Sequence, residues 1–338
     1  MMTSEGSDPA GYTDDAAETH VPRVGRSHRV FESLIARTRG IPAVPTAVVW
    51  PDDAHALKGP VDAAREQIIK PVLIGDAARI HAVADTAGLN LGDCMIVDAP
   101  TEAEAAAAAV GMVRDRKTRA IMKGSLHTDV LMHAVVSIDG GLRTGRRISH
   151  VFLIAAPRYP EILFVTDAAI NIFPDLDCKR DIVQNAIDLH IGLGLGEPRV
   201  ALLSAVEVIN SRIPGTIDAA VLCKMADRGQ ITGGVLDGPL AMDNAVSAEA
   251  AKLKGIVSPV AGRAQILVAP DLEAGNMLAK NLIYMAGADA AGIVLGARVP
   301  VILPSRADSV PARLASAAVG GLYAHHLAQA NNKPGTKP

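Results

Sequence analysis

The chain has 338 residues, 49% of them hydrophobic and 20% charged, which suits one large or two medium globular domains. Aromatic residues make up only 3%, so we expect a core of Ala, Val, Ile and Leu. The formal net charge of -3 provides no basic surface for nucleic acid. Charged or polar residues also interrupt the apolar runs well before the roughly 18 residues that span a bilayer. We therefore expect neither a nucleic-acid partner nor a membrane.

The cysteine pattern indicates a reducing compartment. Cys94, Cys178 and Cys223 are odd in number, widely spaced and without C-x-x-C spacing, so they form neither a disulfide framework nor a zinc motif. A cytoplasmic location fits best. The ten histidines show no ligand spacing, and we expect no metal. The acidic, polar N-terminus lacks an apolar signal segment, so we interpret residues 1–25 as a disordered tail and residues 331–338 as a C-terminal tail.

From about Pro45 onward, short apolar runs alternate with Ala-rich amphipathic segments. This alternation predicts an α/β fold in which helices connect buried parallel strands. The predicted strands lie near residues 46–50, 71–76, 94–100, 119–124, 149–157, 161–167, 199–206, 233–239, 264–271, 291–297 and 300–303.

The clearest predicted helix follows Thr101, which stands in capping-box spacing with Glu104. Further helices are predicted from about Asp175, Pro214, Met242 and Glu273, and over residues 314–328. The run GLGLG at residues 192–196 follows a helix and precedes a strand, the reverse of a nucleotide-binding loop, so we interpret it as a helix end and a turn.

Residues 138–149 interrupt the alternation with paired glycines and three arginines. We interpret this segment as a domain boundary or hinge. Its cations, Arg143, Arg146 and Arg147, could bind phosphate between two domains, or could lie in a solvated loop.

Polar residues follow several predicted strands, where open α/β sheets bind their ligands. We expect them to converge on one edge of the sheet, although any single one could instead be a helix N-cap. They are Lys123, Gly124, Ser125, Thr128, Asp167, Asn171, Asp237, Gly238, Asp271, Gly275, Asn276, Ser305, Arg306 and Asp308.

The segment PSRADS, residues 304–309, is the most distinctive of these. Arg306 can bind a phosphate in bidentate fashion, Ser305 can donate to an oxyanion, and Asp308 can accept a proton. An N-cap beside a surface ion pair is the structural alternative. The chain has no P-loop, H-E-x-x-H or G-x-S-x-G motif, which excludes the enzyme classes that depend on them.

Six long blocks, in order, resemble the phosphate acetyl/butyryltransferase family, most closely phosphate butyryltransferase and the C-terminal part of fused enoyl-CoA hydratase/phosphate acetyltransferase proteins. The short segment before Ile41 leaves no room for a hydratase domain, so we expect a stand-alone transferase. The blocks are MKGSLHTDVL, GLRTGRRISHV, VTDAAINIFPDL, KMADRGQITGGVLDGPLAMDNAVS, SPVAGRAQILVAPDLEAGNMLAK and PSRADS.

The resemblance implies reversible transfer of an acyl group between CoA and inorganic phosphate, with acyl-CoA and CoA as substrates and no tightly bound cofactor. It implies two three-layer α/β/α domains with a cleft between them, as in the isocitrate/isopropylmalate dehydrogenases. Domain I would comprise residues 26–148 plus 291–330, and domain II residues 149–290. It also implies a homodimer or larger homo-oligomer.

On the resemblance and the chemistry together, Arg306 is assigned to the phosphate and oxyanion, and Ser305 to the intermediate or the departing sulfur. Asp308 is assigned to activation of the CoA thiol, with Asp237 as the alternative base because Ala312 stands near the position of the family's proposed base. The expected substrate contacts are Lys123, Arg147, Asp167, Asn171, Asp237, Gly275 and Asn276.

Two other functions stay open from the sequence. A dehydrogenase could share this fold, and a paralogue could bind acyl-CoA without catalysis. The acyl chain length is also open, because one methylene changes discrimination by only about 1 to 3 kcal/mol.

Overall fold

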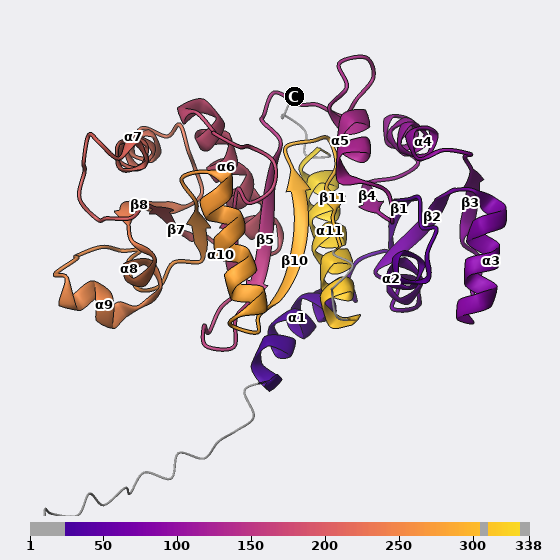
Figure 1. Cartoon of the computed structure of the whole chain (residues 1–338), viewed down its shortest axis with the longest axis horizontal. Coiled ribbons are helices and arrows are strands. Elements are labelled where there is room, and N and C mark those ends of the chain that lie inside the picture. Colours follow the sequence, from indigo (N-terminus) through magenta and orange to yellow (C-terminus); the bar gives the residue numbers. More distant parts are fainter. Residues whose placement is uncertain (1–23, 305–309, 332–338) are drawn as a thin grey trace, which may run out of the picture.

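The computed structural model describes residues 24–304 and 310–331. It is a mixed α/β structure in which one 11-stranded sheet is covered by helices (Figure 1). The predicted α/β class is therefore confirmed. The strands are β1 (Val44–Val49), β2 (Ile69–Gly75), β3 (Met95–Asp98), β4 (Ala120–Lys123), β5 (Ser149–Ala155), β6 (Leu163–Thr166), β7 (Arg199–Leu203), β8 (Val235–Leu240), β9 (Ile266–Val268), β10 (Asp289–Leu295) and β11 (Val301–Ile302).

The helices lie between and after these strands. They are α1 (Val24–Thr38), α2 (Ala54–Arg65), α3 (Ala77–Ala87), α4 (Glu102–Arg114), α5 (Thr128–Val136), α6 (Leu176–Gly192), α7 (Pro214–Asp227), α8 (Met242–Val246), α9 (Ala248–Leu253), α10 (Leu272–Tyr284) and α11 (Val310–Asn331). None of the helices in these described ranges is both long and apolar enough to cross a bilayer.

The strand order is β3-β2-β1-β4-β11-β10-β5-β6-β9-β7-β8. The first five strands in this order are mutually parallel, and the last four are mutually parallel. Between these sets, β10 pairs antiparallel with β11 and β5, and β5 pairs antiparallel with β6. Three consecutive antiparallel pairings reverse the direction, so the two parallel sets run in opposite directions along the sheet. Figure 1 shows β5 and β10 between the two sets.

Four apolar clusters fill the space between sheet and helices. Around the first parallel set, α4 and α5 pack on one cluster, and α2, α3 and α11 on another. Around the second set, α1, α6, α7 and α11 share a cluster, and α8 and α10 share the fourth. Because α11 contributes to two clusters, this helix links the two strand sets.

Local sequence signals agree with most elements. The Thr101 hydroxyl accepts from the Glu104 amide at 3.2 Å, and Asp175 caps α6. The GLGLG run is a helix end and turn, with Gly194 and Gly196 at φ 72° and 84°. At these angles a residue with a side chain would be strained.

Two boundaries differ from the prediction. The single helix expected from Met242 is two short helices, because the Ser247 hydroxyl accepts from the Ala250 amide and starts α9. Helix α1 begins at Val24, within the segment expected to be a tail.

Asn185 links α6 to the start of β5. Its buried Nδ2 donates to the Arg147 carbonyl oxygen and to Ser149 Oγ, each at 2.9 Å. We expect Asn185→Ala to lower the free energy of unfolding by about 1 to 3 kcal/mol, because the buried Ser149 hydroxyl and the partly buried Arg147 carbonyl lose their donor. Urea denaturation measures this. Thr86→Ala, at an exposed helical position, is the control and should stay within about 0.5 kcal/mol of the native chain; an equal effect at both positions would contradict the link.

Candidate active site

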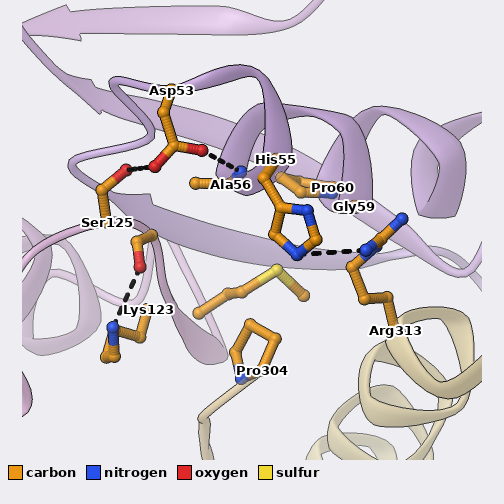
Figure 2. A pocket seen from close by; sticks show the side chains of 11 residues that line it. Asp53, His55, Ala56, Gly59, Pro60, Lys123, Ser125, Pro304 and Arg313 are labelled. Carbon is orange, nitrogen blue, oxygen red and sulfur yellow. Dashed lines mark hydrogen bonds between the residues drawn. The ribbon is translucent and has the colours of Figure 1, made fainter. Parts of the chain in front are cut away.

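A pocket lies at the carboxyl ends of β1, β4 and β11, beside the first turns of α2 and α11 (Figure 2). We call it the β4 pocket. Its cavity volume is about 20 Å³, room for about one water molecule. It is lined by Asp53, His55, Ala56, Gly59, Pro60, Met122, Lys123, Gly124, Ser125, Pro304 and Arg313.

The floor of the β4 pocket depends on a close backbone approach at Gly124. Its amide donates to the Val49 carbonyl at 2.8 Å, and the Ser125 amide donates to the Trp50 carbonyl at 2.9 Å. A Cβ atom at position 124 would lie only 2.5 Å from both carbonyl oxygens. Glycine is therefore required for the end of β4 to pack against the end of β1.

Asp53 connects α2 to the loop after β4. One carboxylate oxygen accepts from the Ala56 amide at 2.8 Å, which caps α2, and the other accepts from Ser125 Oγ at 2.9 Å (Figure 2). Lys123 Nζ donates to the carbonyl oxygens of Gly124 and Leu126, at 3.1 and 2.8 Å. Of the expected substrate contacts, Lys123 thus lines the pocket and also stabilises its loop.

Arg313 and His55 close the other side of the β4 pocket (Figure 2). Arg313 Nη1 lies 3.1 Å from His55 Nε2. Because a guanidinium can only donate, this contact requires an unprotonated Nε2 on His55. A Cβ atom on Gly59 would lie 3.3 Å from Arg313 Cδ, so the bare backbone at Gly59 makes room for the arginine stem.

A second polar cluster lies at the end of β6. Asp167 is buried, and its carboxylate accepts from the amides of Ala169, Ile170 and Asn171. The Asn171 side chain donates to Asp167 Oδ2 at 2.6 Å and to the Ile148 carbonyl at 2.9 Å. These bonds fold residues 167–171 into a turn and fasten it to the segment before β5.

Helix α10 holds the same turn from the other side. Asn276 Nδ2 donates to the Ala168 carbonyl at 3.0 Å, and a Cβ atom on Gly275 would lie 2.3 Å from the Asp167 carbonyl oxygen. The structure therefore brings together four of the expected contacts, Asp167, Asn171, Gly275 and Asn276. It also confirms one N-cap alternative, because Asp271 caps α10 through the Ala274 amide.

The two clusters do not share one edge of the sheet, and that expectation is wrong. Lys123 ends a strand of the first parallel set and Asp167 follows a strand of the second, and these sets run in opposite directions. The register nevertheless sets Thr166 and Met122 level with each other across β5, β10 and β11. Four spacings of roughly 4.8 Å separate β4 from β6, about 19 Å in all. Local patterns did not reveal the reversal because it depends on pairings between distant segments.

Asp237 is also wrongly placed by the sequence. It was expected after a strand, but it lies inside β8, and its Oδ1 accepts from the amide of the next residue, Gly238. The turn residues Gly238 and Pro239 suggested a strand end, but the strand continues past a register shift against β7. Because β8 is the last strand in the order, Asp237 is seven spacings, roughly 34 Å, from β4.

The hinge arginines have separate contacts. Arg146 forms an ion pair with Asp188, and Arg143 forms a β-bridge with Ala297. The Arg147 amide donates to Asp181 Oδ2 at 2.9 Å. The Arg147 side chain lowers the pKa of the Cys178 thiol, against the larger effect of burial. Arg147 therefore lies near Cys178 in the first turn of α6. The charge of Asp167 raises the pKa of the same thiol.

All three cysteine thiols have raised pKa values. Burial is the main cause at Cys94, Cys178 and Cys223, and at Cys223 it raises the pKa to about 12. A nucleophilic cysteine needs the opposite shift. Within the part of the chain that the structure describes, no cluster of three or more His, Cys, Asp or Glu side chains could hold a metal ion.

Ser305, Arg306 and Asp308 lie outside the described residues. Pro304, directly before them, borders the β4 pocket. Sequence reasoning missed four other pocket residues: Asp53, His55, Gly59 and Arg313. The sequence could have indicated Asp53, because an Asp that follows a predicted strand is a typical helix N-cap. No local pattern indicated Arg313, because it lies on a helix far away in the sequence.

A protein-family model described as "Phosphate acetyl/butaryl transferase" matches residues 100–320 of this chain. A phosphate acetyltransferase from Rhizobium meliloti is 60% identical over 294 residues, which cover 87% of this chain and 93% of that protein. This chain belongs to the phosphate acetyl/butyryltransferase family. A phosphate butyryltransferase from Clostridium acetobutylicum is 40% identical over 294 residues, which cover 87% of this chain and 98% of that protein.

Solved structures agree with the family assignment. A branched-chain phosphotransacylase from Enterococcus faecalis V583 superposes with a TM-score of 0.73 at 28% sequence identity. The match covers 83% of this chain and 99% of that one. The β4 pocket and the turn after β6 therefore lie on a fold shared with that phosphotransacylase.

Gly275 allows a test of the contact between α10 and the turn after β6. We expect Gly275→Ala to destabilise the protein by about 1 to 3 kcal/mol, because the new Cβ would press on the Asp167 carbonyl oxygen. Gly111→Ala is the matched control: no atom lies within 4 Å of a Cβ there, and the helical site should gain up to about 1 kcal/mol. Thermal unfolding of both variants distinguishes the effects; a stabilised Gly275→Ala would contradict the close approach.

His150 gives the stability a defined pH dependence. The side chain is 1% exposed, its Nδ1 has no hydrogen-bond partner among the described residues, and its ring meets Phe152 edge-on at 4.4 Å. Burial lowers the pKa of His150 to about 4, with Asp167 opposing the shift and Lys280 reinforcing it. The unfolded chain takes up this proton below about pH 6.5, whereas the folded chain does so only near pH 4, so acid favours unfolding in this interval.

Replacing the ring with an apolar one should remove that contribution. We expect the melting temperature of His150→Phe, relative to the native chain, to rise as the pH falls from 6.5 to 4. Above pH 7 the difference should be constant. Differential scanning calorimetry over this range is the measurement, and parallel curves for the two proteins would show that His150 is protonated equally in both states.

Proposed function

We propose that this protein is a phosphate acyltransferase, which interconverts acyl-CoA plus inorganic phosphate with acyl phosphate plus free CoA. The observation that carries the proposal is a 60% identity to a phosphate acetyltransferase over 87% of the chain. The geometry supports it through a pocket bordered by Pro304, directly before the Ser305–Arg306 pair. A dehydrogenase and a non-catalytic paralogue are not favoured by these relationships.

The reaction exchanges one acyl bond for another. A phosphate oxygen attacks the thioester carbonyl, the carbon–sulfur bond breaks, and the CoA sulfur leaves as a thiolate that takes up a proton. No atom changes its oxidation state, so the substrates alone balance the step without a tightly bound cofactor. The tetrahedral intermediate carries an oxyanion beside the charged phosphate, so positive charge and hydrogen-bond donors lower the barrier most.

We assign Arg306 to the phosphate and the oxyanion, and Ser305 to a hydrogen bond with the intermediate or the departing sulfur. Asp308 is our proton acceptor for the CoA thiol in the reverse direction. The carboxylate of Asp237 is the alternative, and its place in β8 counts against it. These roles follow from the family resemblance and from the chemistry of the three side chains.

Lys123, Arg147, Asp167, Asn171, Gly275 and Asn276 remain our proposed substrate contacts. The turn after β6 and the end of β4 are about 19 Å apart, a span that suits an extended substrate such as CoA better than a small one. Most of these polar groups also hold a loop, so we expect them to contact substrate with backbone amides and remaining donors.

We infer two α/β/α domains, residues 26–148 plus 291–330 and residues 149–290, with a cleft between them as in isocitrate/isopropylmalate dehydrogenases. The reversal of strand direction at β5 and β10 supports this division. We also infer a cytoplasmic homo-oligomer. Two adjacent apolar side chains, Ile172 and Phe173, are 60% and 82% exposed, which supports self-association.

Arg306→Ala tests the assignment of the active site. We expect phosphate-dependent release of CoA from acyl-CoA to fall by at least about 100-fold, since a donor to the developing oxyanion is lost. A thiol reagent follows the release, with phosphate omitted as the blank. Arg39→Ala, in the exposed turn after α1, is the matched control for loss of a cation and should keep native-like release. Native-like turnover by a folded Arg306→Ala would overturn the assignment.

A further inference from the structure

We propose that a second pocket, at the amino ends of β1 and β2, binds a small organic acid with one carboxylate and an apolar chain. We call it the amino-end pocket. Its cavity volume is about 400 Å³, whereas that of the β4 pocket is about 20 Å³. Ligand pockets in proteins commonly measure about 300 to 1,000 Å³, so the amino-end pocket has room for a small organic molecule. The proposal goes beyond the acyl transfer proposed above and does not depend on it.

The amino-end pocket is separate from the candidate active site. It is bordered by Ala43, directly before β1, and by Ile69 and Lys70 at the start of β2. The β4 pocket lies beyond the other end of β1, and the six residues of this strand span about 20 Å. Helix α2 borders the β4 pocket with its first half and the amino-end pocket with its second half. The two sites are therefore distinct, although one helix contacts both.

The inner wall of the amino-end pocket is apolar and belongs to the packed core. Val61 of α2 and Ile69 of β2 are each only 2% exposed, and both are members of one core cluster. Leu91 and Cys94, in the segment between α3 and β3, are partly buried and pack on the same cluster. These side chains are held by their core neighbours, so the apolar wall is formed without a ligand. Such a wall favours a ligand that carries a hydrocarbon chain.

Two cations stand at the rim of this wall. Arg65 ends α2 and Lys70 is the second residue of β2, and both side chains are exposed. Arg65 Nη1 lies 3.8 Å from Asp62 Oδ1, but Asp62 has a closer cation, Lys58 Nζ, at 2.9 Å. Lys70 forms no ion pair with any residue that the structure describes. Both cations are therefore available to an anionic ligand.

The other polar groups of the amino-end pocket indicate how much negative charge the ligand carries. Asp93 is exposed, and its charge raises the pKa of the Cys94 thiol, after the larger effect of burial. Against the two rim cations, Asp93 supplies one negative charge in the lining, which leaves one positive charge for the ligand. Asn90 Oδ1 accepts from the Gly92 amide at 2.9 Å, and Asn90 Nδ2 is a further donor. A monocarboxylate matches this balance better than a dianion does.

Hexanoate is the probe for the native chain, and saturation-transfer NMR of its methylene signals measures the dissociation constant. Two analogues each lack one feature: acetate has the carboxylate without the longer chain, and hexan-1-ol has the chain without the charge. We expect both to bind at least about 5-fold more weakly than hexanoate, since each loses either buried methylenes or a charge-assisted hydrogen bond. Sodium chloride keeps the ionic strength equal in all samples.

Cys94 reports where hexanoate binds, because it lines the amino-end pocket. The uncharged reagent N-ethylmaleimide labels thiols, and peptide mass spectrometry follows each cysteine separately. Hexanoate at about 10 times its dissociation constant should slow the labelling of Cys94 by about 10-fold, because an occupied pocket shields the thiol. Cys223, on α7 at the other end of the sheet (Figure 1), is the internal control, and its labelling rate should not change.

The double variant Arg65→Gln/Lys70→Gln tests the rim cations. We expect it to raise the dissociation constant of hexanoate at least about 5-fold, because hydrogen bonds from charged groups are lost. Lys252→Gln/Lys254→Gln is the matched control, since it removes two exposed cations from α9 and the residue that follows it. This control should stay within about 2-fold of the native value, because solvent and salt screen charges at such a distance.

Absence of hexanoate binding by the native chain would overturn the proposal. Binding that leaves the labelling of Cys94 unchanged, or that is equally tight in Arg65→Gln/Lys70→Gln, would place the ligand elsewhere and overturn it too. Hexan-1-ol that binds as tightly as hexanoate would contradict the role of the cations. The experiment uses no acyl-CoA, so its failure and a failure of the proposed function are distinguishable.

Discussion

The antiparallel pair β5 and β10 is the constraint on which the rest of this structure depends. Seven residue pairs join these strands, from Ser149–Leu295 to Ala155–Asp289. The register of this pair and of its neighbours β11 and β6 sets the carboxyl ends of β4 and β6 near the same level of the sheet, although the two parallel sets run in opposite directions. The β4 pocket lies on one side of this pair, and the turn after β6 lies on the other. Any change in the β5–β10 register would move one cluster relative to the other.

Both clusters are built by the same physical device. Gly124 and Gly275 each allow a backbone to approach within a distance that a Cβ atom would forbid, 2.5 Å from the Val49 carbonyl oxygen and 2.3 Å from the Asp167 carbonyl oxygen. A carboxylate then fixes each loop by accepting several donors, Asp53 beside β4 and Asp167 after β6. These carboxylates organise backbone, which leaves proton transfer to a group elsewhere and favours Asp308 as our proposed base.

Local pattern was enough to predict most elements of the fold. All 11 strands overlap runs that the sequence identifies as apolar, and caps such as Thr101 and Asp175 start the helices expected of them. Strand direction was not predictable in this way, because the reversal depends on pairing residues near 150 with residues near 290. The same limit applied to the site. Lys123 and Asp167 were each predicted from the strands at whose ends they lie, but the distance between them could not be predicted.

The chemistry of the chain's own thiols and of the substrates favours direct transfer as our proposed route. An acyl-cysteine intermediate would require a thiol with a lowered pKa, whereas burial raises the pKa of Cys94, Cys178 and Cys223. The attacking groups, phosphate and the CoA thiolate, already belong to the substrates. The protein's task is then to hold two anionic molecules together and to compensate the charge of the intermediate. Loops that hydrogen bonds hold in place serve that task, and many polar groups of both clusters accordingly bind backbone.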